Sequence, residues 1–457
     1  MQTRWRVIQP PRGFTDTFVR NAWSYDLYDV YTGRYTEGCD RFGMTNTLVN
    51  MTSGTSGVAA YSDVGYTHAG ITSSPNYLFT TRTKGSSSAW DAMRIRLSDF
   101  NLETVSYTAG ETASTKTHVS ALCPYTDDVG FMVVQYYDSG DQWYNLNKIN
   151  FVSGTSTEMI AFPIDGSGYG FQSTDLSIHW VAGVSGWRIV YPYLRWHLDG
   201  FGDPDYATDI DWYIFDPATE TEDVVTQSLS STSFLMPDGY NLFSNSVLID
   251  NKLVTFISNW DADTLIEVHC LDLVALTDTV NVISEPTRTE FVCYGSAPDA
   301  SQKAVYCRCV YYNADLDYVS EVYKYIPSTN TLSSNRIDDV WSNSGQHGIL
   351  ADSQHAYVLI SFDGVDQELI QLSNGNTILT TSVTTSACAT IDDDRHGLIT
   401  ANSGSSTVTV YYDDSSTDTM AIDSATGSTK HLYLHRERFM VIDENGTTDS
   451  FFVVATG

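Results

Sequence analysis

The sequence predicts an all-β chain with very little helix, built from one repeated four-stranded unit. Runs of β-branched and aromatic residues alternate with turns rich in Gly, Ser, Asp and Asn, the pattern of short antiparallel strands. No useful stretch repeats its apolar residues with the period of a helix. The two clearest hairpins have turns that begin at Asn259 and Asn313, 54 residues apart. Such a period in an all-β chain is typical of radially repeated sheets.

The two founding hairpins share one layout, in which two strand-like runs flank a short acidic turn. The first comprises Leu253–Ser258, the turn 259–263 and Thr264–Leu271, and the second comprises Ala304–Tyr312, the turn 313–317 and Tyr318–Tyr325. We expect related strands on either side of them. On the N-terminal side these are Val58–Ser62, Tyr77–Arg82, Met93–Leu97, Thr104–Tyr107, Gly130–Tyr137, Trp143–Phe151, Glu158–Phe162, Ser177–Ala182, Trp187–Arg195, Asp211–Phe215 and Val224–Thr226, with a loop at 199–209. On the C-terminal side they are His355–Phe362, Gln367–Leu372, Thr377–Thr381, Gly397–Ala401, Thr407–Tyr412, Thr417–Ile422, His431–His435, Phe439–Asp443 and Phe451–Val454.

The chain over 57–457 resembles β-propeller proteins, a resemblance that rests on this hairpin periodicity. Eight turns fall in the middle of a unit, which predicts eight blades; they lie near 85, 138, 199, 259, 313, 363, 402 and 443. If one of the irregular regions, 57–116 or 174–230, is not a blade, the number of blades is seven. The resemblance implies a single β-propeller of seven or eight four-stranded blades. The last unit stops after its third strand, so we expect an N-terminal strand, Trp5–Gln9, to close the ring and cover the open edge. Residues 1–56 then form a closing and docking segment before the propeller at 57–457.

Net charge is the most informative bulk property. The chain carries 56 acidic and 24 basic residues, a net charge of −32, with Asp far above Glu and Arg above Lys. Dense short carboxylates repel one another, and molar salt screens that repulsion. The composition therefore resembles proteins of extreme halophiles, with an ordinary acidic extracellular or phage β-protein as the alternative. In either case we expect no nucleic-acid partner, because phosphate binding needs stripes of Lys and Arg.

Seven cysteines occur, with no CxxC pair. Cys307 and Cys309 share a strand face and are poorly placed to bridge each other. Two interpretations stay open: buried free thiols, or a disulfide from Cys293 to Cys307 or Cys309.

The N-terminus lacks the apolar core of roughly 7–15 residues found in secretory signals, and no run approaches about 18 apolar residues, so we expect neither a cleaved signal nor a membrane span.

Three segments contain candidate binding residues. The N-terminal segment forms a basic patch that would dock an acidic partner or close the ring, through Arg4, Arg6, Arg12, Arg20, Arg34 and Arg41. An aromatic and cationic run would stack on sugar rings and bond hydroxyls, or form a blade core, through Trp187, Tyr191, Tyr193, Arg195, Trp196 and His197. An oxygen-rich loop would hold a structural Ca²⁺ or Mg²⁺, or remain a solvated acidic loop, with Asp199, Asp203, Asp205, Asp209 and Asp211.

Catalytic motifs are not found: no G-x-S-x-G, HExxH or P-loop sequence occurs. The acidic, lysine-poor composition rich in Asp, Ser, Thr and Tyr resembles virion proteins of tailed viruses that infect halophilic archaea. That resemblance implies a non-enzymatic tail, baseplate or head-decoration protein located in the virion. Its partners would be other virion proteins, further copies in a symmetric assembly, and a host surface glycan or S-layer. The alternatives are a carbohydrate-active lyase or glycosidase with Tyr191, Arg195 and His197 in an axial pocket, and a cytoplasmic interaction scaffold.

Overall fold

The computed structural model confirms an all-β chain with almost no helix. It describes residues 28–29, 34–35, 46–50, 55–59, 66–73, 76–84, 89–96, 101–108, 116–119, 122–138, 141–162, 176–198, 204–229, 241–243, 246–259, 265–284, 289–312, 318–335, 349–351, 354–361, 367–381, 387–391, 398–402, 407–411, 417–421, 429–435, 438–444 and 449–455. Within these ranges the one helical element is a 3₁₀ turn at Ala182–Val184. No helix of the described part is long and apolar enough to cross a membrane.

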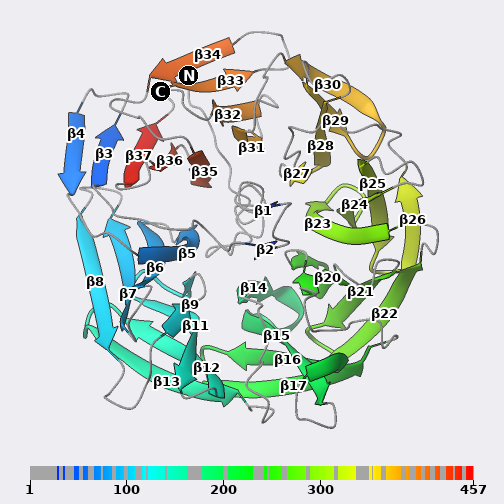
Figure 1. Cartoon of the computed structure of the whole chain (residues 1–457), viewed down its shortest axis with the longest axis horizontal. Coiled ribbons are helices and arrows are strands. Elements are labelled where there is room, and N and C mark those ends of the chain that lie inside the picture. The colour runs from blue at the N-terminus through cyan, green and yellow to red at the C-terminus, as the bar shows by residue number, and fades with distance from the viewer. Residues whose placement is uncertain are drawn as a thin grey trace.

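The described strands form consecutive antiparallel sheets, five of them four-stranded and two five-stranded, which follow one another around a central axis in Figure 1. The first is β5 (Tyr66–Ser73), β6 (Tyr77–Lys84), β7 (Ala89–Arg96) and β8 (Leu102–Thr108). The second is β9 (Lys116–Val119) and β10 (Cys123–Pro124), both paired with β11 (Val129–Asp138), then β12 (Asp141–Asn150) and β13 (Thr155–Phe162). The third is β14 (Ser177–Val181), β15 (Gly186–Leu198), β16 (Pro204–Asp216) and β17 (Thr221–Ser228).

The middle sheets contain both founding hairpins. The fourth sheet is β18 (Asn241–Phe243) and β19 (Val247–Ile249), both paired with β20 (Lys252–Asn259), then β21 (Leu265–Asp272) and β22 (Thr277–Ser284). The fifth is β23 (Thr289–Asp299), β24 (Ala304–Tyr312), β25 (Tyr318–Ile326) and β26 (Thr331–Asn335). The hairpins β20–β21 and β24–β25 therefore lie in neighbouring sheets as their second and third strands, which confirms the predicted repeat.

The later sheets have the same strand order. The sixth is β27 (Ile349–Ala351), β28 (Ala356–Ser361), β29 (Gln367–Gln371) and β30 (Asn376–Thr381), and the seventh is β31 (Ala387–Ile391), β32 (Leu398–Asn402), β33 (Thr407–Tyr411) and β34 (Thr417–Ala421). A three-stranded sheet follows, with β35 (Thr429–His435), β36 (Arg438–Glu444) and β37 (Asp449–Ala455). Two short pairs precede the first sheet: β1 (Tyr28–Asp29) with β2 (Arg34–Tyr35), and β3 (Asn46–Asn50) with β4 (Thr55–Ala59).

Two predicted elements are corrected. Val58–Ser62 was expected to open the first four-stranded unit, but Thr55–Ala59 pairs with β3 and the first sheet begins instead at β5. The predicted loop 199–209 ends early, because β16 already begins at Pro204 and pairs with the end of β15. The segment beside β37 is β3 (Figure 1), whereas Trp5–Gln9 lies outside the described residues.

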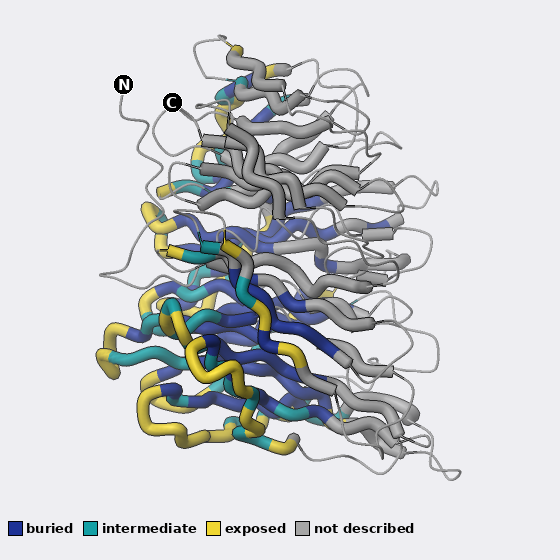
Figure 2. The backbone as a smooth tube through the Cα atoms, turned by 90° about the vertical axis from the view of Figure 1, so that its left-hand side faces the viewer, coloured by how far each residue is buried: buried dark blue, intermediate teal, exposed yellow. Residues whose placement is uncertain are grey.

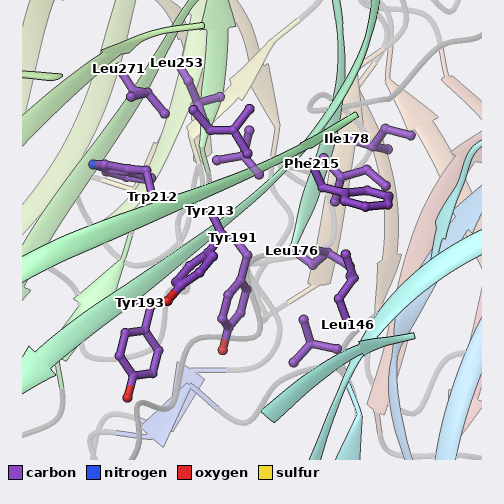
Figure 3. Close-up of a cluster of buried hydrophobic side chains, with 14 of the residues drawn as sticks. Leu146, Leu176, Ile178, Tyr191, Tyr193, Trp212, Tyr213, Phe215, Leu253 and Leu271 are labelled. Atoms are coloured by element: carbon purple, nitrogen blue, oxygen red, sulfur yellow. The ribbon is translucent and has the colours of Figure 1, made fainter. Parts of the chain in front are cut away.

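The core lies between neighbouring sheets. In Figure 2 the central parts of the described strands are buried, and the exposed turns gather along one side of the molecule. The largest cluster joins the second, third and fourth sheets through side chains such as Phe131, Trp212 and Leu253. Figure 3 shows part of it, with Tyr191, Tyr193 and Trp212 among the packed rings. Neighbouring sheets thus bury one another's faces, as closely packed layers must.

Candidate functional site

The predicted aromatic run lies on β15. Tyr191 and Tyr193 are buried in the largest core cluster, and Trp187 is partly buried, its ring 5.5 Å from that of Trp180 in an edge-on arrangement. Arg195 is exposed and forms an ion pair with Asp211 at 2.5 Å. Trp196 and His197 lie on the same strand, but their side chains are outside the described part. The described rings therefore contribute to the core between the sheets.

The predicted acidic loop separates into two parts. Asp199 and Asp203 lie outside the described residues, and Asp205 is described only as a position on β16. Asp211 is buried and accepts hydrogen bonds from Arg195 and from Thr226 Oγ1 at 2.6 Å. Asp209 accepts one from Ser228 Oγ at 2.7 Å. These two carboxylates join neighbouring strands, and no group of three or more His, Cys, Asp or Glu in the described residues is arranged to hold a metal ion.

The predicted docking arginines are not described as side chains. Arg34 lies on β2, and Arg4, Arg6, Arg12, Arg20 and Arg41 fall outside the described residues.

A buried charged cluster joins the third and fourth sheets, and sequence reasoning did not find it. His269 on β21 contacts Asp278 through Nδ1 at 2.7 Å and Glu267 through Nε2 at 3.1 Å, and all three side chains are fully buried. Trp212 Nε1 on β16 donates to the same Asp278 carboxylate at 2.8 Å. With a carboxylate at each ring nitrogen, His269 donates twice as an imidazolium.

The pKa of His269 follows from these contacts. Burial alone lowers it, but the charges and hydrogen bonds of Asp278 and Glu267 outweigh burial and raise the pKa from 6.5 to about 9. No solvent reaches the ring, so it has no route to a substrate. The cluster connects neighbouring sheets instead of forming a reaction centre.

A second charged cluster joins the first and second sheets around Arg94 on β7. Its guanidinium bonds Glu103 at 2.5 Å and Asp128 at 2.7 Å. It also lies over two rings, 4.3 Å from the centre of Tyr77 and 4.8 Å from that of Phe151. Asp128 and Phe151 belong to the second sheet's turns, so one side chain fastens two sheets by charge and by cation–π contact.

The described cysteines are free and buried, which agrees with the interpretation of them as core thiols. Cys307 and Cys309 share a strand face with their sulfurs 3.9 Å apart, and Cys293 lies opposite Cys309 on the next strand. Burial raises the pKa of the Cys307 thiol well above its ordinary value. The Cys307 thiol is therefore a poor nucleophile in the folded protein.

A repeated tight turn forms the exposed edge of the described sheets. It connects the third and fourth strands, and its fifth residue has a left-handed backbone. The five copies are Gly154 (φ 66°), Glu220 (φ 57°), Leu276 (φ 55°), Asn330 (φ 52°) and Gly375 (φ 74°). In the Asp216 and Asp272 copies the first residue's carboxylate accepts two backbone N–H groups at 2.9–3.3 Å, and its carbonyl accepts the fifth residue's N–H.

The turns between the first and second strands of each sheet emerge at the same edge, because the sheets are antiparallel. We call this edge, with both sets of turns, the turn face; most of the described residues that are coloured as exposed in Figure 2 lie along it.

Polar contacts fasten neighbouring sheets along the turn face. The bonded pairs are Lys148 with Glu220, Gly183 with Asn251, Lys303 with Asp250, Lys252 with the Pro327 carbonyl, Asn281 with Asn330, and Gln302 with the Ser373 carbonyl. Together with Arg94 and Asp128 they connect the first six sheets in series. Each exposed contact adds little by itself, but the series restrains the relative positions of the sheets.

Apolar side chains protrude from the same turns. Among the described residues the large exposed apolar side chains are Val152, Val184, Val224, Val274, Leu276 and Val282. Four of these lie on turns of the turn face, namely Val152, Val184, Val274 and Leu276. The other two lie on outer strands, Val224 on β17 and Val282 on β22. The turn face thus carries exposed apolar side chains on turns that are fastened to one another.

Comparisons with known proteins give no family. No protein-family model matches the chain, and no curated protein sequence matches it. Similar solved structures include a prolyl endopeptidase (TM-score 0.47, 10% identity). The match covers 86% of this chain but only 61% of the endopeptidase. They also include Saccharomyces cerevisiae Sqt1 (TM-score 0.47, 10% identity, 83% of this chain and 93% of that one). A third is an oligogalacturonate lyase in complex with manganese (TM-score 0.40, 10% identity, 84% and 86%).

Proposed function

We propose that the chain is a rigid, non-enzymatic interaction module, a structural component of a virion, built as one closed propeller of eight blades. Seven blades would be the four- and five-stranded sheets, and the eighth would combine β35–β37 with β3. The position of β3 beside β37 supports this closure. A density map that resolves individual blades tests it, because seven blades, or a gap between β37 and β3, would contradict the proposal.

The turn face is the observation that carries the function. The buried charged groups around His269 and Arg94 connect sheets instead of lining an open reaction site, and the exposed turns are fastened to one another. A surface of this kind is suited to assembly, where positional rigidity lowers the entropic cost of binding. The net charge of −32 supports a protein that works in high salt, as a virion protein of a virus that infects halophilic archaea would.

Localisation tests this function directly. In the organism that encodes the chain, an antibody against the full protein should label purified particles and co-sediment with them. Recovery of the protein only as a soluble monomer in cell cytoplasm would overturn the proposal. A stable cellular partner found with that monomer would favour the scaffold alternative.

The carbohydrate-active alternative predicts a different result. It would require turnover of acidic polysaccharides that is lost on His197→Ala. Tyr191 is buried and Arg195 is ion-paired, so no described contact favours this alternative. Turnover by the wild-type chain would overturn the non-enzymatic proposal.

A further inference from the structure

Three exposed apolar side chains lie on two adjoining turns of the third and fourth sheets, on the turn face. Val184 lies in the turn between β14 and β15, and Val274 and Leu276 lie in the turn between β21 and β22. Their side chains are 36%, 45% and 36% exposed, respectively. We call these three residues the apolar turn patch.

The two turns are fitted to each other, so the patch is preformed. A Cβ added to Gly183 would lie 2.5 Å from the Val274 side chain, so any larger residue there would displace that side chain. Gly183 N–H also donates to Asn251 Oδ1 at 3.0 Å, and the Leu273 N–H donates to the Asn251 carbonyl at 3.0 Å. The half-buried rings of Trp180 and Trp187 support the base of the first turn. The turn that carries Val184 and the turn that carries Val274 are therefore held side by side, and binding requires little reordering.

The charged groups around the patch are compensated within the chain. Glu220 pairs with Lys148, Asp216 with Arg188, and Asp250 with Lys303. The carboxylate of Asp272 accepts the N–H groups of its own turn, and Lys252 lies opposite Asp272 in the pairing of β20 with β21. On a chain with a net charge of −32, this is a locally neutral and apolar surface. Such surfaces, depleted of free charge at their centre, are typical of the cores of protein–protein interfaces.

We propose that the apolar turn patch is a two-fold interface between two copies of this chain, with the turn faces opposed. A second copy presents the same neutral, apolar surface, so no unpaired charge is desolvated when the two meet. A cationic partner would gain little here, because the nearby carboxylates already have donors. The proposal does not depend on a virion, since it rests on the surface alone.

Salt dependence distinguishes this occupant from others. Two copies each with a net charge of −32 repel one another at long range, and salt shortens that repulsion from roughly 10 Å at 0.1 M to roughly 3 Å at 1 M. Association through an apolar patch therefore strengthens as NaCl rises. Binding to a cationic partner would weaken with salt instead.

Sedimentation equilibrium of the full chain between about 0.1 and 2 M NaCl tests the proposal, with conditions chosen to span the screening range. The wild type should dimerise more tightly as salt rises. Val274→Asp and Leu276→Asp should each lower the association constant about tenfold or more, because two-fold symmetry places each new charge at the interface twice. Val224→Asp is the matched control, since Val224 is 46% exposed but lies on the outer strand β17. The control should dimerise like the wild type.

Leu276→Asp also protects the test against misfolding. Position 276 has φ 55°, and Asp tolerates that backbone better than Leu, so this variant should fold at least as well as the wild type. A chain that stays monomeric at every salt concentration would overturn the proposal. So would association that weakens with salt, or an equal loss in the Val224→Asp control. Dimerisation in a protein absent from particles would overturn the virion function and leave this interface standing.

Discussion

At the scale of single residues, His269 is the most informative group, because its charge state is coupled to folding. Its folded-state pKa of about 9 lies above the unfolded value near 6.5, as a result of Asp278 and Glu267. A raised folded pKa gives stability that is fully present below about pH 6.5 and lost as pH rises through about 9. We expect the free energy of unfolding to fall across that window by at most about 3 kcal/mol.

Urea unfolding from pH 6 to 10 measures this loss, and His269→Gln supplies the comparison. Gln keeps a donor near the carboxylates but does not titrate, so the variant should be less stable at pH 6 and should lack this part of the slope. Parallel slopes for the wild type and the variant would mean that His269 does not change its charge between pH 6.5 and 9.

Arg94 makes the second residue-scale prediction. Its side chain is 5% exposed, and it serves Glu103, Asp128 and two rings at once. Arg94→Met should cost about 3 kcal/mol, because removing one member of a buried ion pair leaves its partners uncompensated. Arg96→Met is the matched control on the same strand. Arg96 bonds the same Glu103 but is 36% exposed, so its loss should cost less than about 1 kcal/mol. Equal losses in thermal unfolding would argue against a special role for Arg94.

At the scale of elements, the repeated turn allows a substitution test in both directions. Leu276 occupies the left-handed fifth position that Gly154 and Gly375 fill in other copies. Leu276→Gly should therefore raise stability by up to about 1 kcal/mol, and Gly375→Ala should lower it by a similar amount. An added Cβ at Gly375 meets nothing within 4 Å, so backbone strain is the only cost. If both changes shifted the urea midpoint in the same direction, the turn conformation would not be the cause.

The sequence predicts elements well where alternation is local and regular. The hairpins β20–β21 and β24–β25 are unbroken runs, and their bounds match the predicted runs to within about two residues. β5 was missed because a register shift between His68 and Ile71 interrupts its alternation, as a bulge does. The start of β16 was missed because Pro204 and the following Asp residues disfavour strands, and pairing with the end of β15 overrides that preference.

The polar clusters needed the structure. Trp212 and Asp278 are 66 residues apart and meet only because neighbouring sheets pack face to face. The signal that sequence reasoning could have used is local: Glu267 and His269 alternate with apolar residues on a central strand, where charge is expensive unless paired. The sequence could likewise have predicted the first residue of the repeated turn, which is Asn150, Asp216 or Asp272. Asn and Asp in turns accept backbone N–H groups a few residues further along the chain.

At the scale of the whole molecule, net charge sets the response to salt. Carboxylates outnumber basic groups by 32, and the described ion pairs neutralise only some of them. The remaining charges repel more strongly in the compact fold than in the unfolded chain, so the melting temperature should rise with NaCl. Most of the rise should occur below about 1 M, where the screening length shortens most. Protein at about 1 μM, well below the dissociation constants of typical weak dimers, keeps dimerisation from contributing.

A charge-reversal variant separates screening from general salt effects. Glu222 and Asp223 are exposed on the outer strand β17, and Lys at both positions replaces negative charge with positive charge. Glu222→Lys with Asp223→Lys should raise the melting temperature at low salt and flatten its increase with NaCl. Glu222→Gln with Asp223→Asn should have an intermediate effect, because it removes the charges without reversing them. If all three proteins gained equally from salt, the stabilisation would come from strengthened apolar burial and not from relief of carboxylate repulsion.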